Sequence, residues 1–293
     1  MLRFVQGLRK VYVGEVVLGT STSTLDASGD VTGTWDMSSV TIEDARAAAK
    51  HLTGRIEQIP PMVSAIKVGG TRLHTLARQG IEIDRAPREV TVERFEIREL
   101  TGPVELADLT EPDGSAERDG AGPDGAGPDG AGLAGDAPVL RIEVDCSTGT
   151  YVRSLAADLG ELLGGGAHLR NLRRTKIGSF GLSEAHRLEA LAPEHILTPA
   201  QGLRDLQRLE VSSEAARRVS HGLPVEWATL LIAGGDTGGD TGGATGGAAE
   251  LSGSTVGSGA VGPYAVVDRS GRLLAVYESA GPDRIVSACV LAS

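Results

Sequence analysis

The sequence predicts an α+β fold, in which a mixed or antiparallel sheet carries a few helices and is followed by a small β-barrel-like domain. The first observation is that strand-like alternation and helix-like spacing of apolar residues succeed one another between Lys10 and Ile177. The second is that short strand-like pieces follow one another from Leu209, with a hairpin turn predicted at Asp268 to Gly271.

These two patterns of apolar residues predict two domains, over 1–206 and 209–293. Each is interrupted by a low-complexity tract, at about 107–137 with repeated GPDGA and at about 234–262 with repeated TGGD and TGGA. Such tracts contain too little apolar surface to offset the entropy lost on ordering, so we expect both to be disordered inserts.

The net charge of −11 comes from these tracts alone. Nine carboxylates and one arginine lie between Glu105 and Asp136, and three carboxylates with no base lie between Gly234 and Gly262. The remainder of the chain is neutral, so the acidic balance does not exclude a nucleic-acid partner.

The first elements are predicted by alternation and capping. Lys10 to Gly19 reads as a strand and ends in a polar turn, Thr20 to Gly29. Thr41 to Leu52 reads as a helix, with Thr41 as N-cap and Asp44 three residues on.

The middle of the chain reads as extended segments around one short helix. The prolines of Ile59 to Met62 force an extended backbone, and a strand and tight turn follow over Val63 to Gly70. Thr71 to Gln79 reads as a helix. Glu89 to Leu100, with a bulge near Arg94, and Pro138 to Cys146 read as the strands of a hairpin whose tip holds the acidic insert.

The stretch from Cys146 to Gly160 is the main candidate for a site. A short glycine-containing crossing leads from a strand to a helix, and it places Tyr151 and Arg153 beside the unpaired amides of the first helical turn. An aromatic ring, a guanidinium and free amides suit a planar base or an anion. The alternative is a half-buried core tyrosine and a solvated arginine.

Ala167 to Ile177 holds the one strong basic cluster, with four permanent positive charges and no carboxylate. Such a cluster suits phosphate contacts. An ordinary basic surface strand is the alternative interpretation.

Two cysteines are too few for a disulfide framework or a cysteine-rich zinc site. No apolar run reaches the roughly 18 residues of a membrane span, and no apolar segment follows the N-terminal charges as in a signal peptide. A cytoplasmic protein without membrane attachment is the expectation.

Six motifs occur in one order: Lys10-Val-Tyr12-Val-Gly14, Gln58-Ile-Pro-Pro-Met-Val-Ser-Ala-Ile-Lys67, Leu76-Ala-Arg78-Gln-Gly80, Cys146-Ser-Thr-Gly-Thr-Tyr151-Val-Arg153, Asp158-Leu-Gly160 and Ala167-His-Leu-Arg-Asn-Leu172-Arg173-Arg174. In this order they resemble the TruB-type tRNA pseudouridine synthases, which isomerise the uridine at position 55 of the T-loop. The resemblance covers about residues 9–180. The tail resembles the PUA-like RNA-binding domain of the actinobacterial branch.

The resemblance implies an intramolecular isomerase that needs no metal or redox cofactor. The uridine is flipped out, its glycosidic bond to N1 is broken, and the uracil is rejoined through C5. By resemblance, Tyr12 stacks on the uracil, Tyr151 contacts the base or its ribose, and Leu172 lines the apolar side. Arg153 should pair with the catalytic aspartate.

The resemblance further implies a monomer that binds the T-arm of tRNA without a membrane or metal partner. Its implied phosphate-binding residues are Lys67, Arg72, Arg78, Arg173 and Arg174.

The sequence departs from the family pattern at the nucleophile. Family members carry the catalytic aspartate in a Gly-His-x-Gly-Thr-Leu-Asp-Pro-like motif upstream of the Tyr12 strand, and this chain has no such motif. Thr24-Leu25-Asp26 copies part of it but follows that strand, so we predict that Asp26 is not the nucleophile.

We therefore expect a catalytic domain that is incomplete at its N-terminus and inactive alone, with an open sheet edge and with Arg153 lacking a carboxylate partner. The alternative function is a non-catalytic tRNA-binding protein or RNA chaperone. A guide-RNA-dependent relative is a weaker option.

Overall fold

The computed structural model describes most of both predicted domains. The described residues are 1–64, 67–68, 70–73, 75, 81, 83–100, 138–223, 225–226, 262–279 and 284–291. The two predicted inserts lie outside the described residues, and so do Arg78 and the side chains of Lys67 and Arg72.

The chain divides into two compact units, Gly7–Ser183 and Met1–Gln6 together with Glu184–Ser293. The sequence analysis placed the boundary later, between 206 and 209. The difference has a packing cause, because Phe4, Ala200 and Leu203 are buried in one cluster with residues of the C-terminal strands. The segment before residue 206 therefore belongs to the C-terminal unit.

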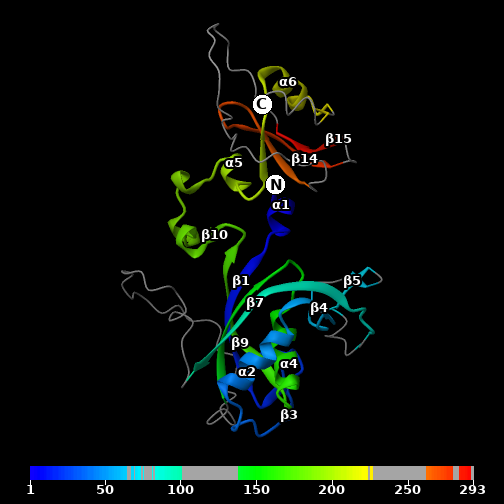
Figure 1. Cartoon of the computed structure of the whole chain (residues 1–293), viewed down its shortest axis with the longest axis vertical. Helices are drawn as coiled ribbons and strands as arrows, with labels where there is room; N and C mark the ends of the chain where they lie inside the picture. The colour runs from blue at the N-terminus through cyan, green and yellow to red at the C-terminus, as the bar shows by residue number, and fades with distance from the viewer. Residues whose placement is uncertain are drawn as a thin grey trace, which may run out of the picture. The chain divides into compact units, whose positions relative to one another are not determined.

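Gly7–Ser183 is built on a six-stranded antiparallel sheet with the order β10-β9-β1-β8-β7-β4 (Figure 1). Its strands, in chain order, are β1 (Lys10–Leu18), β4 (Gly54–Gln58), β7 (Arg88–Leu100), β8 (Val139–Cys146), β9 (Ala167–Ile177) and β10 (Phe180–Gly181). The antiparallel sheet and its helices confirm the predicted α+β fold.

The predicted hairpin is confirmed by the antiparallel pairing of β7 with β8, and its tip lies outside the described residues. The register runs from Val92 opposite Cys146 to Leu100 opposite Val139, and it shifts between Val92 and Arg94. The predicted bulge near Arg94 is therefore present.

Helices α2 (Ile42–His51) and α4 (Val152–Leu162) pack on one face of this sheet (Figure 1). Thr41 caps α2, because its side chain accepts from the Asp44 amide while the Asp44 carboxylate accepts from the Thr41 amide. The core contains fully buried side chains from both helix and sheet, among them Val16, Ile142 and Leu159.

Asp158, on α4, gives this unit a predicted pH dependence. Burial, with a smaller contribution from Glu161, raises the pKa of the Asp158 carboxyl from 3.8 to about 6. Because the folded state holds this proton more tightly than the unfolded state, the stabilisation is complete below pH 3.8 and is lost as pH rises to about 6. Asp158→Asn should therefore raise the free energy of unfolding at pH 7 by about 1 kcal/mol, allowing for solvent screening of a half-buried group.

Urea unfolding at pH 4.5 and pH 7 measures this effect. Glu161→Gln is the control, because it removes only the smaller contribution. An Asp158→Asn variant that loses as much stability between the two pH values as the native chain would contradict the prediction.

Two small ribbons accompany the main sheet. One pairs β2 (Thr20–Thr22) with β3 (Val31–Thr34), and the other pairs β5 (Lys67–Val68) with β6 (Thr71–Arg72). The predicted helix does not begin at Thr71, because Thr71 and Arg72 pair with Val68 and Lys67. Leu73 and Thr75 are helical, and the remainder of the predicted helix lies outside the described residues.

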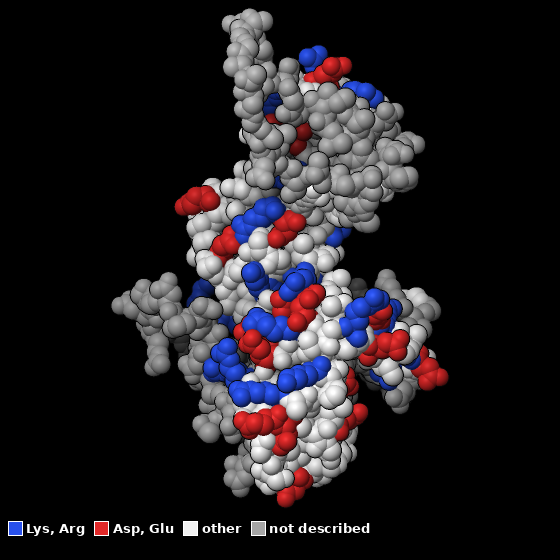
Figure 2. Space-filling view, in the orientation of Figure 1, with Lys and Arg blue, Asp and Glu red and all other residues white. Residues whose placement is uncertain are grey.

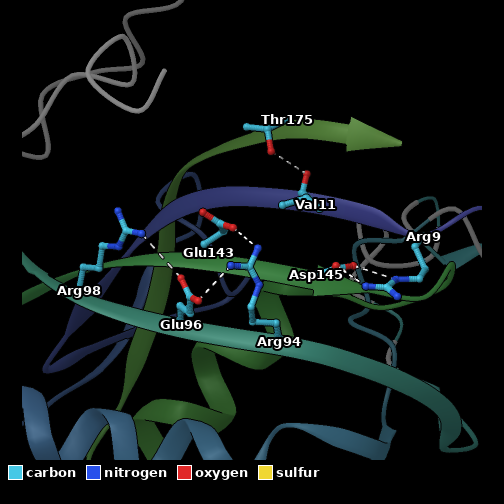
Figure 3. Close-up of polar contacts among 8 residues, drawn as sticks. All are labelled: Arg9, Val11, Arg94, Glu96, Arg98, Glu143, Asp145 and Thr175. Atoms are coloured by element: carbon cyan, nitrogen blue, oxygen red, sulfur yellow. Dashed lines mark hydrogen bonds and ion pairs between the residues drawn. The ribbon is translucent and has the colours of Figure 1, made fainter. Parts of the chain in front are cut away.

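The sheet face opposite the helices carries interlocked charges (Figure 3). Arg94 on β7 donates to Glu96 at 3.0 Å and also to Glu143 on β8. Arg9 pairs with Asp145. Because these arginines are already matched by carboxylates, this part of the surface is not a free basic patch.

The C-terminal unit has a five-stranded sheet with the order β11-β13-β14-β15-β12. Its strands are β11 (Gln207–Glu210), β12 (Val225–Glu226), β13 (Tyr264–Val267), β14 (Leu273–Ser279) and β15 (Arg284–Val290). The predicted turn after Asp268 is confirmed as the link between β13 and β14, and the Asp268 carboxylate accepts from the Ser270 and Arg272 amides. A closed barrel would need β11 to pair with β12, and the pairings of the described residues contain none.

Short helices complete this unit: α1 (Leu2–Gln6), η2 (Leu182–Glu184, which reaches into it), η3 (Leu188–Ala190), η4 (Pro193–His195), α5 (Pro199–Gly202) and α6 (Ser213–Ser220). Among the described residues, no helix has the length and apolar character needed to cross a bilayer.

Candidate active site

A pocket of about 340 Å³ opens in Gly7–Ser183 where a turn, a helix and a strand meet. The turn is the one that follows β2, the helix is α4, which contributes its first helical turn, and the strand is β9. The lining residues are Asp26, Ala27, Ser28, Arg153, Leu169, Arg170, Asn171 and Leu172.

The turn that carries Asp26 is tied to β9 by backbone hydrogen bonds. The Leu169 amide donates to the Leu25 carbonyl, and the Ala27 amide donates to the Leu169 carbonyl, both at 3.0 Å. Leu25 has a φ of +63°, a left-handed conformation that a branched side chain rarely adopts. These contacts hold Asp26 at the pocket wall.

Arg153 joins this turn to two other segments. Its Nη1 donates to Asp26 Oδ2 at 2.9 Å and to the Thr24 carbonyl at 3.3 Å, and its Nη2 donates to the Val63 carbonyl at 2.8 Å. The expectation that Arg153 has no carboxylate partner is therefore wrong. The turn folds back onto β9, and this brings Asp26 beside the start of α4.

The Asp26 carboxylate is held in its ionised form. Burial raises its pKa, but hydrogen bonds from Ser28 and Thr24 and the charge of Arg153 outweigh burial and lower the pKa below its usual value. Oδ1 accepts from Thr24 Oγ1 at 2.6 Å, from Ser28 Oγ at 2.5 Å and from the Ser28 amide at 3.1 Å. Both oxygens are thus occupied, which suits a positioning group better than an attacking one.

The start of α4 is set by Gln58, the last residue of β4. Its amide oxygen accepts from the Tyr151 amide at 2.9 Å, and its amide nitrogen donates to the Tyr151 carbonyl at 3.3 Å. Tyr151 is the N-cap of α4, directly before the helical turn that carries Arg153. Tyr151 itself is not among the residues that line the pocket.

Leu172, which the resemblance places on the apolar side of the uracil site, is among the residues that line this pocket, and 41% of its surface is exposed. It lies across from Gly14 of β1, where an added Cβ would approach Leu172 Cδ1 to 3.2 Å. Gly14 therefore leaves the room that the leucine side chain needs.

Tyr12 lies on the same face of β1 as Gly14, two residues away, and packs half-buried against the core. Burial raises the pKa of its phenol, and a hydrogen bond with Arg174 offsets part of that rise. Tyr12 does not line the pocket, so the structure brings Arg153 and Leu172 together and places Tyr12 and Tyr151 outside the lining.

The basic cluster of β9 is divided between the two faces of the sheet. Arg174 pairs in register with Tyr12, and Arg173 pairs with Val13, so neighbouring arginines point to opposite faces. On the face of the molecule that Figure 2 shows, basic and acidic side chains are interspersed. Only Arg174 of this pair shares a face with Tyr12.

Sequence reasoning missed several residues that shape the pocket. Gln58 was present in a recognised motif, but its link to Tyr151 joins residues 93 positions apart. Glu15, a carboxylate inside an apolar strand, was a signal that the prediction did not use. Its side chain is fully buried and accepts from Arg170 and Asn171, which both line the pocket.

Comparison with protein families gives two matches along the chain. The model for "TruB family pseudouridylate synthase (N terminal domain)" matches residues 1–112, and the model for "tRNA pseudouridylate synthase B C-terminal domain" matches residues 153–212. This chain belongs to the TruB family.

Curated relatives agree with the TruB assignment. The tRNA pseudouridine synthase B of Symbiobacterium thermophilum is 39% identical over 225 residues, which are 76% of this chain and 64% of that protein. The protein of the same name from Rhodococcus jostii is 43% identical over 195 residues, 66% of this chain and 54% of the relative. The chain thus spans less than two thirds of the length of these TruB relatives.

Solved structures share the fold. A chain of the Cbf5–Nop10–Gar1 complex superposes with a TM-score of 0.57 at 18% identity, over 99% of this chain and 68% of the other. A chain of an H/ACA RNP bound to a substrate RNA containing 2′-deoxyuridine gives a TM-score of 0.53 at 15% identity, over 98% of this chain and 67% of the other.

Both TruB family models contribute to the pocket. The Asp26 turn lies in the first matched segment, whereas Arg153 and Leu172 lie in the second. Among the described residues, no group of three or more His, Cys, Asp or Glu side chains is placed to hold a metal ion.

Proposed function

We propose that this chain binds the T-arm of tRNA and holds one uridine, at position 55 of the T-loop, in the Asp26–Arg153–Leu172 pocket for isomerisation to pseudouridine. Membership of the TruB family supports the reaction class. The observation that carries the proposal is the fixed Arg153 guanidinium, which shares one pocket with the apolar side chain of Leu172.

The reaction asks for such a pocket. A base must leave its stack before its glycosidic bond is exchanged, so the site needs an apolar surface for the ring and a charged group near the breaking bond. In the proposal, Leu172 supplies the apolar surface for the ring, and Arg153 supplies the charged group near the breaking bond. Tyr12 stacks on the uracil and Tyr151 contacts base or ribose once RNA is bound.

Asp26 is assigned a positioning role. Three donors contact Oδ1 and Arg153 contacts Oδ2, so both carboxylate oxygens accept hydrogen bonds. The attacking carboxylate is left unassigned among the described residues.

A second candidate function is tRNA binding without turnover. One observation favours it. Among the described residues that line the pocket, Asp26 is the only carboxylate, and it already forms an ion pair with Arg153. In both cases we propose that the protein acts as a monomer in the cytoplasm, where its tRNA substrate resides.

One assay separates these candidates when it is run on this chain preceded by the family's Gly-His-x-Gly-Thr-Leu-Asp-Pro-like segment, without which we expect no turnover. A T-arm hairpin tritiated at uridine C5 reports turnover by tritium release, and its fluorescent equivalent reports affinity, with an anticodon-arm hairpin as control RNA. Release from the T-arm alone supports the synthase. Preferential binding without release supports the second candidate, and equal binding of both hairpins contradicts both.

The positioning role of Asp26 is tested in the same assay. If Asp26 only holds Arg153, then Asp26→Asn, Arg153→Ala and the double variant should lose turnover by similar factors, because both single changes break one unit. Complete loss in Asp26→Asn with residual turnover in Arg153→Ala would instead make Asp26 the nucleophile.

The division of the basic cluster predicts unequal phosphate contacts. Arg174→Ala should weaken hairpin binding and reduce the slope of log affinity against log salt by about 1. Arg173→Ala, on the other sheet face, is the matched control and should lose less affinity. Titrations between 50 and 200 mM salt measure both, and equal slopes for the two variants would show that RNA wraps around the β9 edge.

A further inference from the structure

Glu15 is a buried carboxylate on the sheet face opposite the helices. Its side chain has no exposed surface, and its Oε2 accepts from Arg170 Nε at 2.8 Å and from Asn171 Nδ2 at 2.9 Å. A carboxylate is costly to bury unless it is paired and hydrogen-bonded. Both partners line the pocket, so this contact links the sheet interior to the pocket wall.

The contact lies at a bulge between β1 and β9. Val13 pairs with Arg173 and Glu15 pairs with Arg170, so Asn171 and Leu172 both lie opposite Gly14. Asn171 has a φ of +53°, the left-handed conformation that asparagine tolerates better than most residues. The Asn171 side chain that Glu15 holds is therefore the side chain of the bulged residue.

The bulge decides which face each following side chain takes. Side chains of an unbroken strand alternate between the two sheet faces. If β9 had no inserted residue, Leu172 would therefore share the face opposite the helices with Arg170 and Glu15. With the bulge, Leu172 lies beside Gly14 on the face that carries the helices. Arg173 then lies on the opposite face, and Arg174 lies on the helix side, where it contacts Tyr12.

We propose that Glu15 is a positioning residue, which pins the Asn171 bulge and thereby turns Leu172 and Arg174 toward the uridine pocket. This inference rests on the proposed function, because its test uses protection of the pocket residues by bound RNA. Loss of the Glu15 contact frees Asn171 to leave the left-handed conformation, and the phase of β9 beyond it then shifts by one residue.

Cysteines introduced at two positions of β9, each read from its own peptide beside the native Cys146 and Cys289, test the phase directly. Leu172→Cys and Arg173→Cys are each combined with Glu15→Leu, and iodoacetamide modification of each site is followed by peptide mass spectrometry with and without a T-arm hairpin. Glu143→Leu is the matched control, because it removes a carboxylate from the same face that pairs with Arg94 on β7. The buried thiol of Cys146 reports global unfolding in every sample.

In the native background, RNA should slow modification at position 172 at least fivefold and leave position 173 within twofold. Glu15→Leu should abolish or invert this contrast, Glu143→Leu should keep it, and Cys146 should remain unmodified. A Glu15→Leu protein with the same contrast as Glu143→Leu would overturn the proposal.

Two further measurements cover the remaining outcomes. If RNA protects neither site in the native background, the proposed function fails, and the ratio of the two modification rates without RNA decides the inference. That ratio should change at least fivefold in Glu15→Leu and stay constant in Glu143→Leu. If Cys146 reacts in the Glu15→Leu protein, that variant is unfolded, and the Asn171→Ala variant is used in its place. Asn171 is exposed, and a retained contrast there would equally overturn the proposal.

Discussion

In the chain preceded by the family's Gly-His-x-Gly-Thr-Leu-Asp-Pro-like segment, replacing Arg153 with alanine should lower the turnover of T-arm RNA about 100-fold or more and weaken RNA binding less than about tenfold. The side chain is three-quarters buried and bonds to Asp26 and to the carbonyls of Thr24 and Val63. Its removal leaves the partly buried Asp26 carboxylate without its cationic partner and releases both the Asp26 turn, which lines the pocket, and the Val63 segment. We therefore expect turnover to fall by a larger factor than RNA affinity.

The same change should lower the free energy of unfolding of Gly7–Ser183 by about 2 kcal/mol, because hydrogen bonds to charged groups contribute more than neutral ones. Arg153→Lys is the control. It keeps the charge but cannot donate to Asp26 and Val63 together through one planar group, so it should recover little turnover.

Tritium release gives the turnover and fluorescence anisotropy gives the affinity of each variant. Equal losses in both quantities would show that Arg153 only binds phosphate. Full turnover in Arg153→Lys would show that the charge alone matters.

Replacing Gly160 with alanine should destabilise Gly7–Ser183 by about 3 kcal/mol or more. A Cβ at Gly160 would lie 2.4 Å from the Ala167 nitrogen and 2.6 Å from the Gly166 carbonyl carbon. Both are backbone atoms, so no side-chain rotation relieves the clash and α4 must move away from β9. The predicted sign is the reverse of intrinsic helix propensity, which favours alanine over glycine by about 1 kcal/mol.

Urea unfolding followed by Trp35 fluorescence measures this loss, since the Trp35 ring lies against Gly166. Gly181→Ala is the matched control, because its nearest neighbour would be Ser183 Oγ at 3.8 Å. A Gly160→Ala protein as stable as Gly181→Ala would mean that α4 and β9 are not packed as closely as described.

Displacement of α4 also connects this packing to the site. Arg153 lies in the first turn of the same helix, and β9 carries Leu172. A Gly160→Ala protein that folds should therefore lose turnover as well, which the tritium assay would detect.

Much of the fold was readable from local pattern. Alternation identified β1 and β8, the Thr41 capping box identified the start of α2, and a phase break identified the bulge near Arg94. Each of these signals lies within a few residues of the element that it specifies, so sequence reading could recover it.

The candidate site was predicted in part. Arg153 and Leu172 were expected at the pocket and line it, whereas Tyr12 and Tyr151 do not line it. The contact between Arg153 and Asp26 joins residues 127 positions apart, so no local spacing encodes it. The β5–β6 ribbon at Thr71 was missed for a different reason, because the local pairing of Thr71 with Val68 overrides a weak helix propensity at the same residue.

The sequence by itself determined the order of strands and helices, the motifs shared with the TruB family and the charge pattern of β9. Only the tertiary structure decided that the Asp26 turn folds onto β9 to meet Arg153, and that one bulge beside Glu15 sets which of the two sheet faces Arg173 and Arg174 each take. The physical reason is that periodicity depends on near neighbours, whereas the choice of a partner across the sheet depends on packing and hydrogen bonding among distant segments.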